Sequence, residues 1–469
     1  MRQIASFIAL FAVLLIGLTQ ADIQPASGQF ATNTPAPNTA MPTSLPPTEN
    51  GPQNATAVPT EDGSTSGGGI FATNTVSGPT NTPESTATDT VTATPSATPS
   101  STPTATPTST DTPSPTPTQV GPYSYPEGIN PLTGLPYLDE EAMQRRNLIV
   151  KISNYPPLVR PQYGVNSADV VYEYEAEGGV TRFAAIFRSQ SPGRVGSVRS
   201  GRLMDIQLAT MYRALLAYSG TSQPIQDLFL GEGFFDYQLL SPSIGHDCET
   251  DGFCRDEELR QLVPFEHTLF GDTDKMWQTA TRQGANTGWV ARGFSFAEEP
   301  DPNGTPANDI FINWYGQTDA RWQYDEETSR YLRYTDSVPH YDKGDGEQLW
   351  VDNIVIIVVP HERRPDLFEP GAKNESLEIQ LWGQNLAYVV RDGEYWNGYW
   401  RRENEEQGTA LQLIYGNNQS IKLKPGRTWV EVVRGFGDVT ISEQQADMVA
   451  TATILAQTPS PTPIETHPD

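Results

Sequence analysis

The sequence predicts an α+β protein: a mixed α/β domain followed by a β-rich domain, both behind a long segment without secondary structure. Three observations lead to this fold class. Composition changes sharply near residue 121, strand and helix patterns alternate after it, and from about residue 310 nearly all patterns are those of strands. We therefore expect an α/β domain over 122–300 and a β-rich domain over 301–450.

Residues 1–21 have the pattern of an export signal. Arg2 supplies a positive charge, residues 4–18 are almost entirely apolar, and the segment ends in Thr-Gln-Ala, as a cleavage site would. An uncleaved membrane anchor is the alternative, although about fifteen apolar residues are fewer than the roughly twenty that span a bilayer. No cysteine lies near the cleavage point, so we do not expect lipid attachment there. The sequence thus predicts an exported protein, outside the cell or in the cell envelope.

Residues 22–121 are expected to form a disordered linker. Thr, Pro, Ser, Ala and Asn dominate this segment, and Thr-Pro units repeat, for example over 92–103. Branched apolar residues are nearly absent, so the segment cannot offset the entropy lost on ordering, and frequent prolines favour extended backbone. Residues 451–469 share this composition and are expected to form a disordered tail.

Charge narrows the classes of partner. The formal net charge is −27, of which residues 122–450 carry about −19. So acidic a body argues against nucleic acid and against adhesion to anionic lipid. Contact with a membrane is expected only through residues 1–21, if they are retained.

The first half of the body has alternating patterns. An apolar run predicts a buried strand over 147–153, and period-two patterns predict strands over 169–176 and 180–187, joined at Gly178-Gly179 as a two-residue hairpin turn. A helix capped by Ser200 and ending near 213, a strand over 214–219 and a helix after Ser222 follow.

The second half is expected to be almost entirely strands. Turns such as Asp392-Gly393 and Pro425-Gly426 separate several of them. The expected strands cover 310–314, 321–324, 331–334, 353–359, 386–391, 398–401, 411–415, 420–423 and 428–433.

The two cysteines, Cys248 and Cys254, predict one small-loop disulfide in an oxidising compartment. An overlapping alternative is a calcium loop, because the spacing of the neighbouring acidic residues approaches that of such loops. Its candidate ligands are Asp247, Glu249, Asp251 and Glu258, with Gly252 at the turn. We favour a disulfide-pinned acidic loop, with no metal site and no cofactor.

Several strings, in order, resemble the YerB-type family of bacterial envelope lipoproteins, a domain family of unknown function. The resemblance covers most of the body and rests on the segments 130–134, 160–162, 168–173, 177–183, 196–202, 322–325 and 425–429. It implies an exported envelope protein with an N-terminal mixed domain and a C-terminal β-rich domain. It does not indicate which activity the protein has. The chain departs from the family pattern by lacking a lipid-attachment cysteine, and by having Pro264-Phe265-Glu266-His267 where a Pro-His-Asn string is usual.

A cluster of charged residues is the candidate site. With a two-residue turn, Glu175 would face Arg182, and Glu173, Glu175, Glu177 and Arg182 would share one face of the hairpin. Arg suits bidentate capture of carboxylate or phosphate, and a helix N-terminus adds N–H donors. The candidate ligand-binding residues are Glu175, Glu177, Arg182, Arg199, Arg202 and Asp205.

Three functions remain open at this point. We favour binding of a partner or of an anionic envelope ligand, such as a cell-wall polymer or a lipid-linked glycan. A cell-wall polymer-modifying, phosphotransferase-like enzyme that uses the Arg cluster is the second possibility. In the third, a structural or scaffold protein, the Arg side chains only neutralise the Glu row. The sequence contains none of the common hydrolase, metalloprotease or P-loop motifs, so it leaves catalysis undecided.

Overall fold

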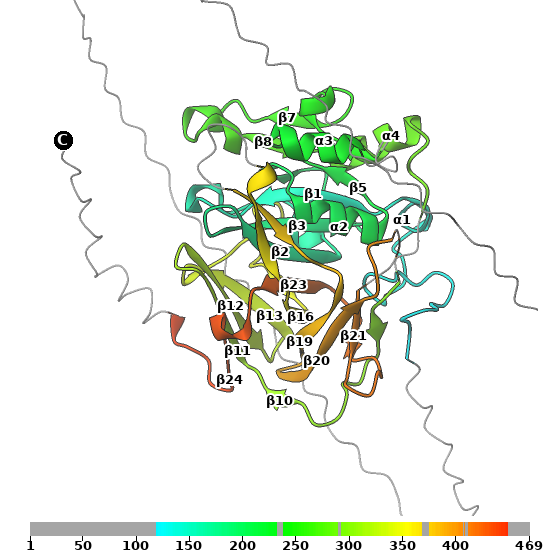
Figure 1. Ribbon diagram of the computed structural model, residues 1–469, viewed down its shortest axis with the longest axis vertical. Coiled ribbons are helices and arrows are strands. Elements are labelled where there is room, and N and C mark those ends of the chain that lie inside the picture. Colours follow the sequence, from blue (N-terminus) through cyan, green and yellow to red (C-terminus); the bar gives the residue numbers. More distant parts are fainter. Residues whose placement is uncertain are drawn as a thin grey trace, which may run out of the picture. The chain divides into compact units, whose positions relative to one another are not determined.

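The computed structural model describes residues 119–231, 238–288, 292–367, 375–406, 408 and 411–448. The predicted export signal, nearly all of the Thr/Pro segment and the C-terminal tail lie outside the described residues. The described part is mostly β with some α, and none of its helices is long and apolar enough to cross a membrane. Its α-helices all precede residue 283 (Figure 1): α1 (Glu140–Gln144), α2 (Leu203–Tyr212), α3 (Gln223–Gly231) and α4 (Thr273–Arg282).

A central sheet runs through both halves of the body. Strand β23 of the second half pairs in parallel with β2 of the first half on one side and with β16 on the other. The strand order is β10 (Thr305–Pro306), β20 (Glu394–Arg402), β19 (Gly383–Arg391), β16 (Asn353–Val358), β23 (Thr428–Val433), β2 (Val170–Ala176), β3 (Val180–Phe187), β1 (Leu148–Ser153), β5 (Leu215–Ala217) and β6 (Leu239–Leu240), with β21 (Gln412–Ile414) on β20.

A second sheet packs against one face of the first. Its order is β14 (Val338–Pro339), β13 (Arg330–Thr335), β12 (Thr318–Asp325), β11 (Asp309–Trp314) and β24 (Val439–Ser442), with β15 (Trp350–Val351) on β13. Small sheets pair β17 (His361–Arg364) with β18 (Ser376–Ile379), β9 (Ser295–Phe296) with β22 (Lys422–Leu423), and β8 (Leu269–Gly271) with β4 (Val195–Gly196) and β7 (Phe253–Arg255). Short 3-10 helices are η1 (Pro157–Val159), η2 (Val165–Ser167), η3 (Pro242–Ile244), η4 (Leu259–Gln261), η5 (Phe265–His267), η6 (Pro365–Leu367) and η7 (Phe436–Asp438).

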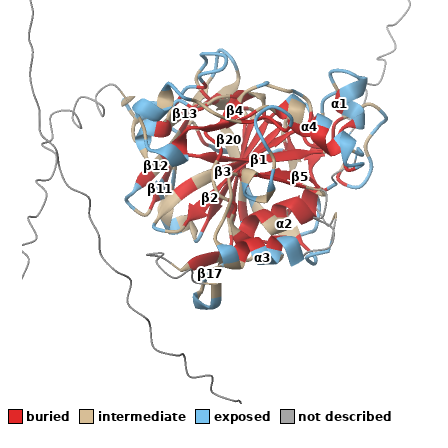
Figure 2. Cartoon of the chain, turned by 90° about the horizontal axis from the view of Figure 1, so that it is seen from above, coloured by how far each residue is buried: buried red, intermediate tan, exposed pale blue. Residues whose placement is uncertain are grey.

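Each face of the central sheet has its own apolar core. Tyr172 and Tyr174 of β2 pack with Leu208 of α2 in one core, which we call the helix face. On the opposite face of the central sheet, Phe183 packs with Trp322 of the second sheet. We call this the sheet face, because the second sheet covers it. Because successive side chains of a strand point to opposite faces, two covered faces leave β1 and β2 buried along their whole length (Figure 2). This accounts for the continuous apolar run of β1.

The structure confirms the expected strands, but it corrects two local predictions. Helix α2 begins at Leu203, with Arg202 rather than Ser200 at its N-cap position. The hairpin turn contains three residues, since Ala176 pairs with Val180 and Tyr174 with Arg182. The predicted pairing of Glu175 with Arg182 is therefore wrong by one position.

That one-residue difference moves side chains to the other face of the sheet. Arg182 lies on the helix face with Tyr172 and Tyr174, not with Glu173 and Glu175. Phe183 and Phe187 lie on the sheet face, opposite to Tyr172 and Tyr174.

Candidate anion-binding site

The candidate site lies where the β2–β3 hairpin meets the N-terminus of α2 on the helix face. Strand pairing sets Lys151 of β1 opposite Ala184, and Ser153 opposite Arg182. Since Arg182 also faces Tyr174, the alternation of the strands puts Lys151, Tyr174 and Arg182 on one face. The corrected register thus brings Arg182 beneath the start of α2.

Beneath α2 lies a fully buried polar triad, which we call the Lys–Tyr–Asp network. Lys151 Nζ donates to the hydroxyl of Tyr174, which in turn donates to Asp205 Oδ1, and Lys151 Nζ is also 3.2 Å from Asp205 Oδ1. The side chains of Lys151 and Asp205 have no exposed surface. Burial lowers the pKa of Lys151 to about 8, against the attraction of Asp205.

Asp205 also fixes the start of α2. Its Oδ2 accepts a hydrogen bond from the backbone N–H of Arg202 at 2.7 Å, as the N3 carboxylate of a capping box does. Arg202 in turn donates Nε–H to Glu177 in the hairpin turn. These two contacts tie the helix start to the hairpin.

Two guanidinium groups of the cluster have no carboxylate within ion-pair distance among the described residues. Arg182 Nη1 donates to the carbonyl of Ser200 at 3.0 Å, and Arg199 Nη1 donates to the carbonyl of Glu266 at 3.0 Å. Burial, together with the neighbouring charges of Arg202 and Arg199, holds the pKa of Arg182 well below its ordinary value. Burial likewise lowers the pKa of Arg199.

Glu175 does not join this cluster. It lies on the sheet face, where its carboxylate makes two hydrogen bonds with Arg434, Nε to Oε2 at 2.8 Å and Nη2 to Oε1 at 2.9 Å. The structure therefore brings together Glu177, Arg182, Arg199, Arg202 and Asp205, and it separates Glu175 from them.

Sequence reasoning missed Lys151 and Tyr174 as members of the site. Lys151 lies in an apolar strand pattern, and Tyr174 lies at an apolar position of a period-two pattern, so both are easily assigned to the core. A lysine within an otherwise apolar, buried strand was the available signal, because a buried lysine needs a partner.

His267 lies at the rim of the cluster. Its Nε2 is 4.0 Å from the carboxylate of Glu266, and burial followed by the charge of Arg199 lowers the pKa of His267. Within the described part of the chain, its Nδ1 has no hydrogen-bond partner.

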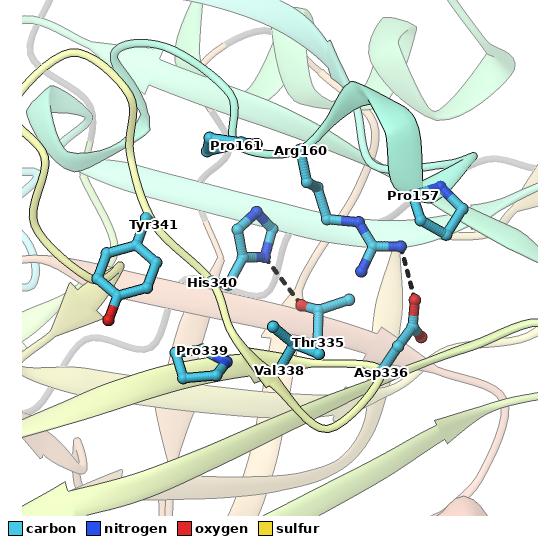
Figure 3. A pocket seen from close by; sticks show the side chains of 9 residues that line it. All are labelled: Pro157, Arg160, Pro161, Thr335, Asp336, Val338, Pro339, His340 and Tyr341. Atoms are coloured by element: carbon cyan, nitrogen blue, oxygen red, sulfur yellow. Dashed lines mark hydrogen bonds and ion pairs between the residues drawn. The ribbon is translucent and has the colours of Figure 1, made fainter. Parts of the chain in front are cut away.

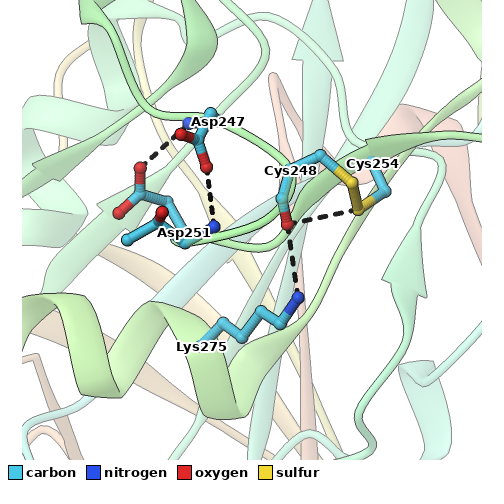
Figure 4. Close-up of a disulfide and its surroundings, with 6 residues drawn as sticks. Asp247, Cys248, Asp251, Cys254 and Lys275 are labelled. Atoms are coloured by element: carbon cyan, nitrogen blue, oxygen red, sulfur yellow. Dashed lines mark hydrogen bonds between the residues drawn. A yellow bond between two sulfur atoms is a disulfide. The ribbon is translucent and has the colours of Figure 1, made fainter.

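The predicted disulfide between Cys248 and Cys254 is present, with Cα atoms 4.5 Å apart (Figure 4). Two acidic side chains of this loop, those of Asp247 and Asp251, bind protein groups. Asp247 Oδ1 accepts from the backbone N–H of Thr250 at 2.7 Å, and Asp251 accepts from Thr279 Oγ1 at 2.8 Å. Over the residues that the structure describes, no three His, Cys, Asp or Glu side chains are grouped so as to hold a metal ion.

A separate cavity of about 330 Å³ opens between η1 and β14 (Figure 3). Three prolines, Val338 and Tyr341 give it a mainly apolar lining, and Arg160 pairs with Asp336 at 2.6 Å on one side. His340 contacts the Gln162 side-chain oxygen through Nε2 at 2.6 Å and Thr335 through Nδ1 at 2.9 Å. Because burial lowers the pKa of His340 well below 6.5, this cavity offers no free positive charge from its histidine.

The fold and site define a two-part protein, mostly β with some α, that has a half-buried cluster of cations. Two family models match it in order, the N-terminal domain of the protein family of unknown function DUF3048 over residues 132–286 and the C-terminal domain of that family over 310–430. The chain belongs to the DUF3048 family, and the resemblance to the YerB type is thereby confirmed.

One relative is the protein named "Putative lipoprotein YerB" of Bacillus subtilis (strain 168). It is 26% identical over 326 residues, which make up 67% of this chain and 88% of that protein. A crystal structure of YerB from the same organism matches with a TM-score of 0.56 at 23% identity, covering 67% of this chain and 99% of that one. This structural likeness concerns the fold alone.

Proposed function

We propose that this chain is an exported cell-envelope protein whose body binds an anionic group of an envelope ligand through Arg182, Arg199 and Arg202. The name of the relative, a lipoprotein, supports an envelope location, as does the signal-like pattern of residues 1–21. The anion would be a phosphate or carboxylate carried by a wall polymer or by a lipid-linked glycan.

One observation carries the proposal: a surplus of positive charge at one place in a strongly acidic body. Arg182 and Arg199 are partly buried and donate to main-chain carbonyls rather than to carboxylates. A desolvated guanidinium without a counter-ion is costly, and a bound anion would relieve that cost with strong, charge-assisted hydrogen bonds. The backbone N–H groups at the start of α2 add a partial positive charge to the same place.

Binding is favoured over catalysis by the accessibility of the titratable groups. Lys151 and Asp205 are the candidates for proton transfer, but neither has exposed side-chain surface. A general base must come within hydrogen-bond reach of the substrate, which these two do not.

Thermal unfolding of the full-length chain in the presence of pyrophosphate tests the proposal. A ligand at 100 times its Kd stabilises the folded state by about 2.7 kcal/mol. We expect this stabilisation in the unsubstituted chain and its loss in Arg182→Met and Arg199→Met.

The matched control is Arg434→Met, which removes the same charge from the bidentate pair with Glu175 and should retain the response to pyrophosphate. Equal responses in all variants would exclude binding at this cluster. If the two test variants fail to fold and pyrophosphate does not stabilise the unsubstituted chain, the Arg side chains have a structural role instead.

A further inference from the structure

The charges of the candidate site do not balance. Its half-buried and buried cations are Lys151, Arg182, Arg199 and Arg202, and the carboxylates among them are Glu177 and Asp205. The carboxylate of Glu266 attracts Arg199 at this rim, but the Glu266 side chain is 55% exposed, so solvent screens that attraction. With Lys151 protonated, the enclosed groups carry a surplus of two positive charges.

Three elements around Lys151 contribute charged or titratable groups. Tyr174 comes from β2, Arg182 from β3, and Asp205 and Arg202 from α2. Asp205 attracts the ammonium group, whereas the charges of Arg182 and Arg202 repel it. The same two guanidinium groups belong to the proposed anion site.

We infer that the site takes a doubly charged anion and holds a proton on Lys151 while the anion is bound, so that anion binding and protonation of Lys151 reinforce each other. The inference rests on the proposed function and adds to it the charge of the ligand and its regulation by pH.

The coupling follows from electrostatics. Without an anion, burial and the two Arg charges lower the pKa of Lys151 to about 8. An anion on Arg182 and Arg202 cancels their repulsion and raises the pKa of Lys151. Linkage is reciprocal, so protonated Lys151 strengthens anion binding by the same factor. A pKa shift of one unit corresponds to a change of about tenfold in affinity.

Calorimetric titration of the full-length chain with sulfate tests this inference, since sulfate stays doubly charged across the pH range of interest. We expect proton uptake on binding at pH values around and above 8, measured from the dependence of the heat on the ionisation enthalpy of the buffer. If anion binding raises the pKa of Lys151 by one unit, the affinity for sulfate should fall about tenfold between pH 7 and pH 10. Methyl sulfate, which carries one charge, should bind more weakly than sulfate at pH 7.

Two substitutions isolate the role of Lys151. Lys151→Arg keeps a positive charge at all these pH values, so it should bind sulfate with a pH-independent affinity and without proton uptake. Lys151→Met should remove proton uptake and lower the affinity at pH 7 towards the value of the unsubstituted chain at pH 10. If either variant fails to fold, proton uptake by the unsubstituted chain still decides the question.

The outcomes separate the two claims. Sulfate binding without proton uptake, or equal affinity for sulfate and methyl sulfate, would overturn the inference and leave the proposed function standing. Absence of binding by sulfate and by pyrophosphate would overturn both.

Discussion

Arg333 is enclosed between two glutamates on the sheet face. Its guanidinium lies 2.7 Å from Glu173 Oε2 and 3.3 Å from Glu431 Oε1, and none of the three side chains has exposed surface. The rings of Trp429 and Trp322 lie 4.7 and 5.1 Å from the guanidinium, in the range of cation–π contacts. Two buried carboxylates share one cation, so burial and the charge of Glu173 raise the pKa of Glu431.

Replacing Glu431 by Gln should therefore change the pH dependence of stability. The folded carboxyl keeps its proton above the ordinary pKa of 4.5, so the folded state binds more protons than the unfolded state. The stability that the Glu431 carboxyl contributes is complete below its ordinary pKa, and it is lost as the pH rises through the raised pKa of the folded state. Glu431→Gln should gain stability relative to the unsubstituted chain as the pH rises from about 4.5 to about 8, measured by urea unfolding.

Arg333→Met provides the contrasting variant, because it leaves Glu173 and Glu431 buried without a cation. A loss of about 3–5 kcal/mol is expected. If Glu431→Gln and the unsubstituted chain instead showed parallel pH profiles, the carboxyl would not hold a proton in the folded state.

Lys151 shows the limit of sequence reasoning at the scale of residues. The strand that contains it was predicted correctly, but its partners Tyr174 and Asp205 are 23 and 54 positions away in the sequence, on a neighbouring strand and on a helix. Which polar residues meet inside a core depends on packing between elements, and no local pattern encodes that.

Among the elements, the β2–β3 hairpin shows that correctly predicted strands can still place a site residue on the wrong face of the sheet. Both strands were predicted within one residue, whereas the turn includes Glu177 as well as Gly178-Gly179. Both glycines have positive φ, +88° and +74°, which any hairpin turn of two or three residues could use. The glycine pair therefore predicts a turn but not its length, and a change of one residue decides which face Arg182 occupies.

The disulfide loop gives a prediction at the same scale. Cys248 and Cys254 close a loop with a sequence separation of 6, for which loop-closure entropy corresponds to about 2 kcal/mol. The double variant Cys248→Ser with Cys254→Ser should lose about that amount in urea unfolding. The reduced unsubstituted chain should match the double variant, and a reduced chain as stable as the oxidised one would contradict the expected role of the bond.

For the whole molecule, the main feature that the sequence does not reveal is the continuous central sheet. The last α-helix of the described residues, α4, ends at Arg282, and strands and 3-10 helices follow it. However, β23 inserts between β16 and β2, more than 250 positions after β2 in the sequence. Pairing over such a separation leaves no mark in local periodicity.

This topology predicts that the two halves depend on each other for folding. A fragment of residues 119–300 would lack β23, so β2 would become an unpaired edge, and the aromatic core of the sheet face would be exposed. We expect residues 119–448 to unfold in one cooperative transition and residues 119–300 alone to show none, measured by circular dichroism during heating. A sharp transition for the shorter fragment would show instead that the first half is an independent domain.

Anion binding at the Arg cluster is the central claim, and locating a bound anion tests it most directly. Tungstate resembles phosphate in shape and charge and can be located in a crystal by its anomalous scattering. We predict an anomalous peak within hydrogen-bond distance of the guanidinium groups of Arg182 and Arg199 in crystals of the full-length chain soaked in tungstate, and no such peak for Arg199→Met. Peaks only at other places, or the same peak in the variant, would contradict the claim.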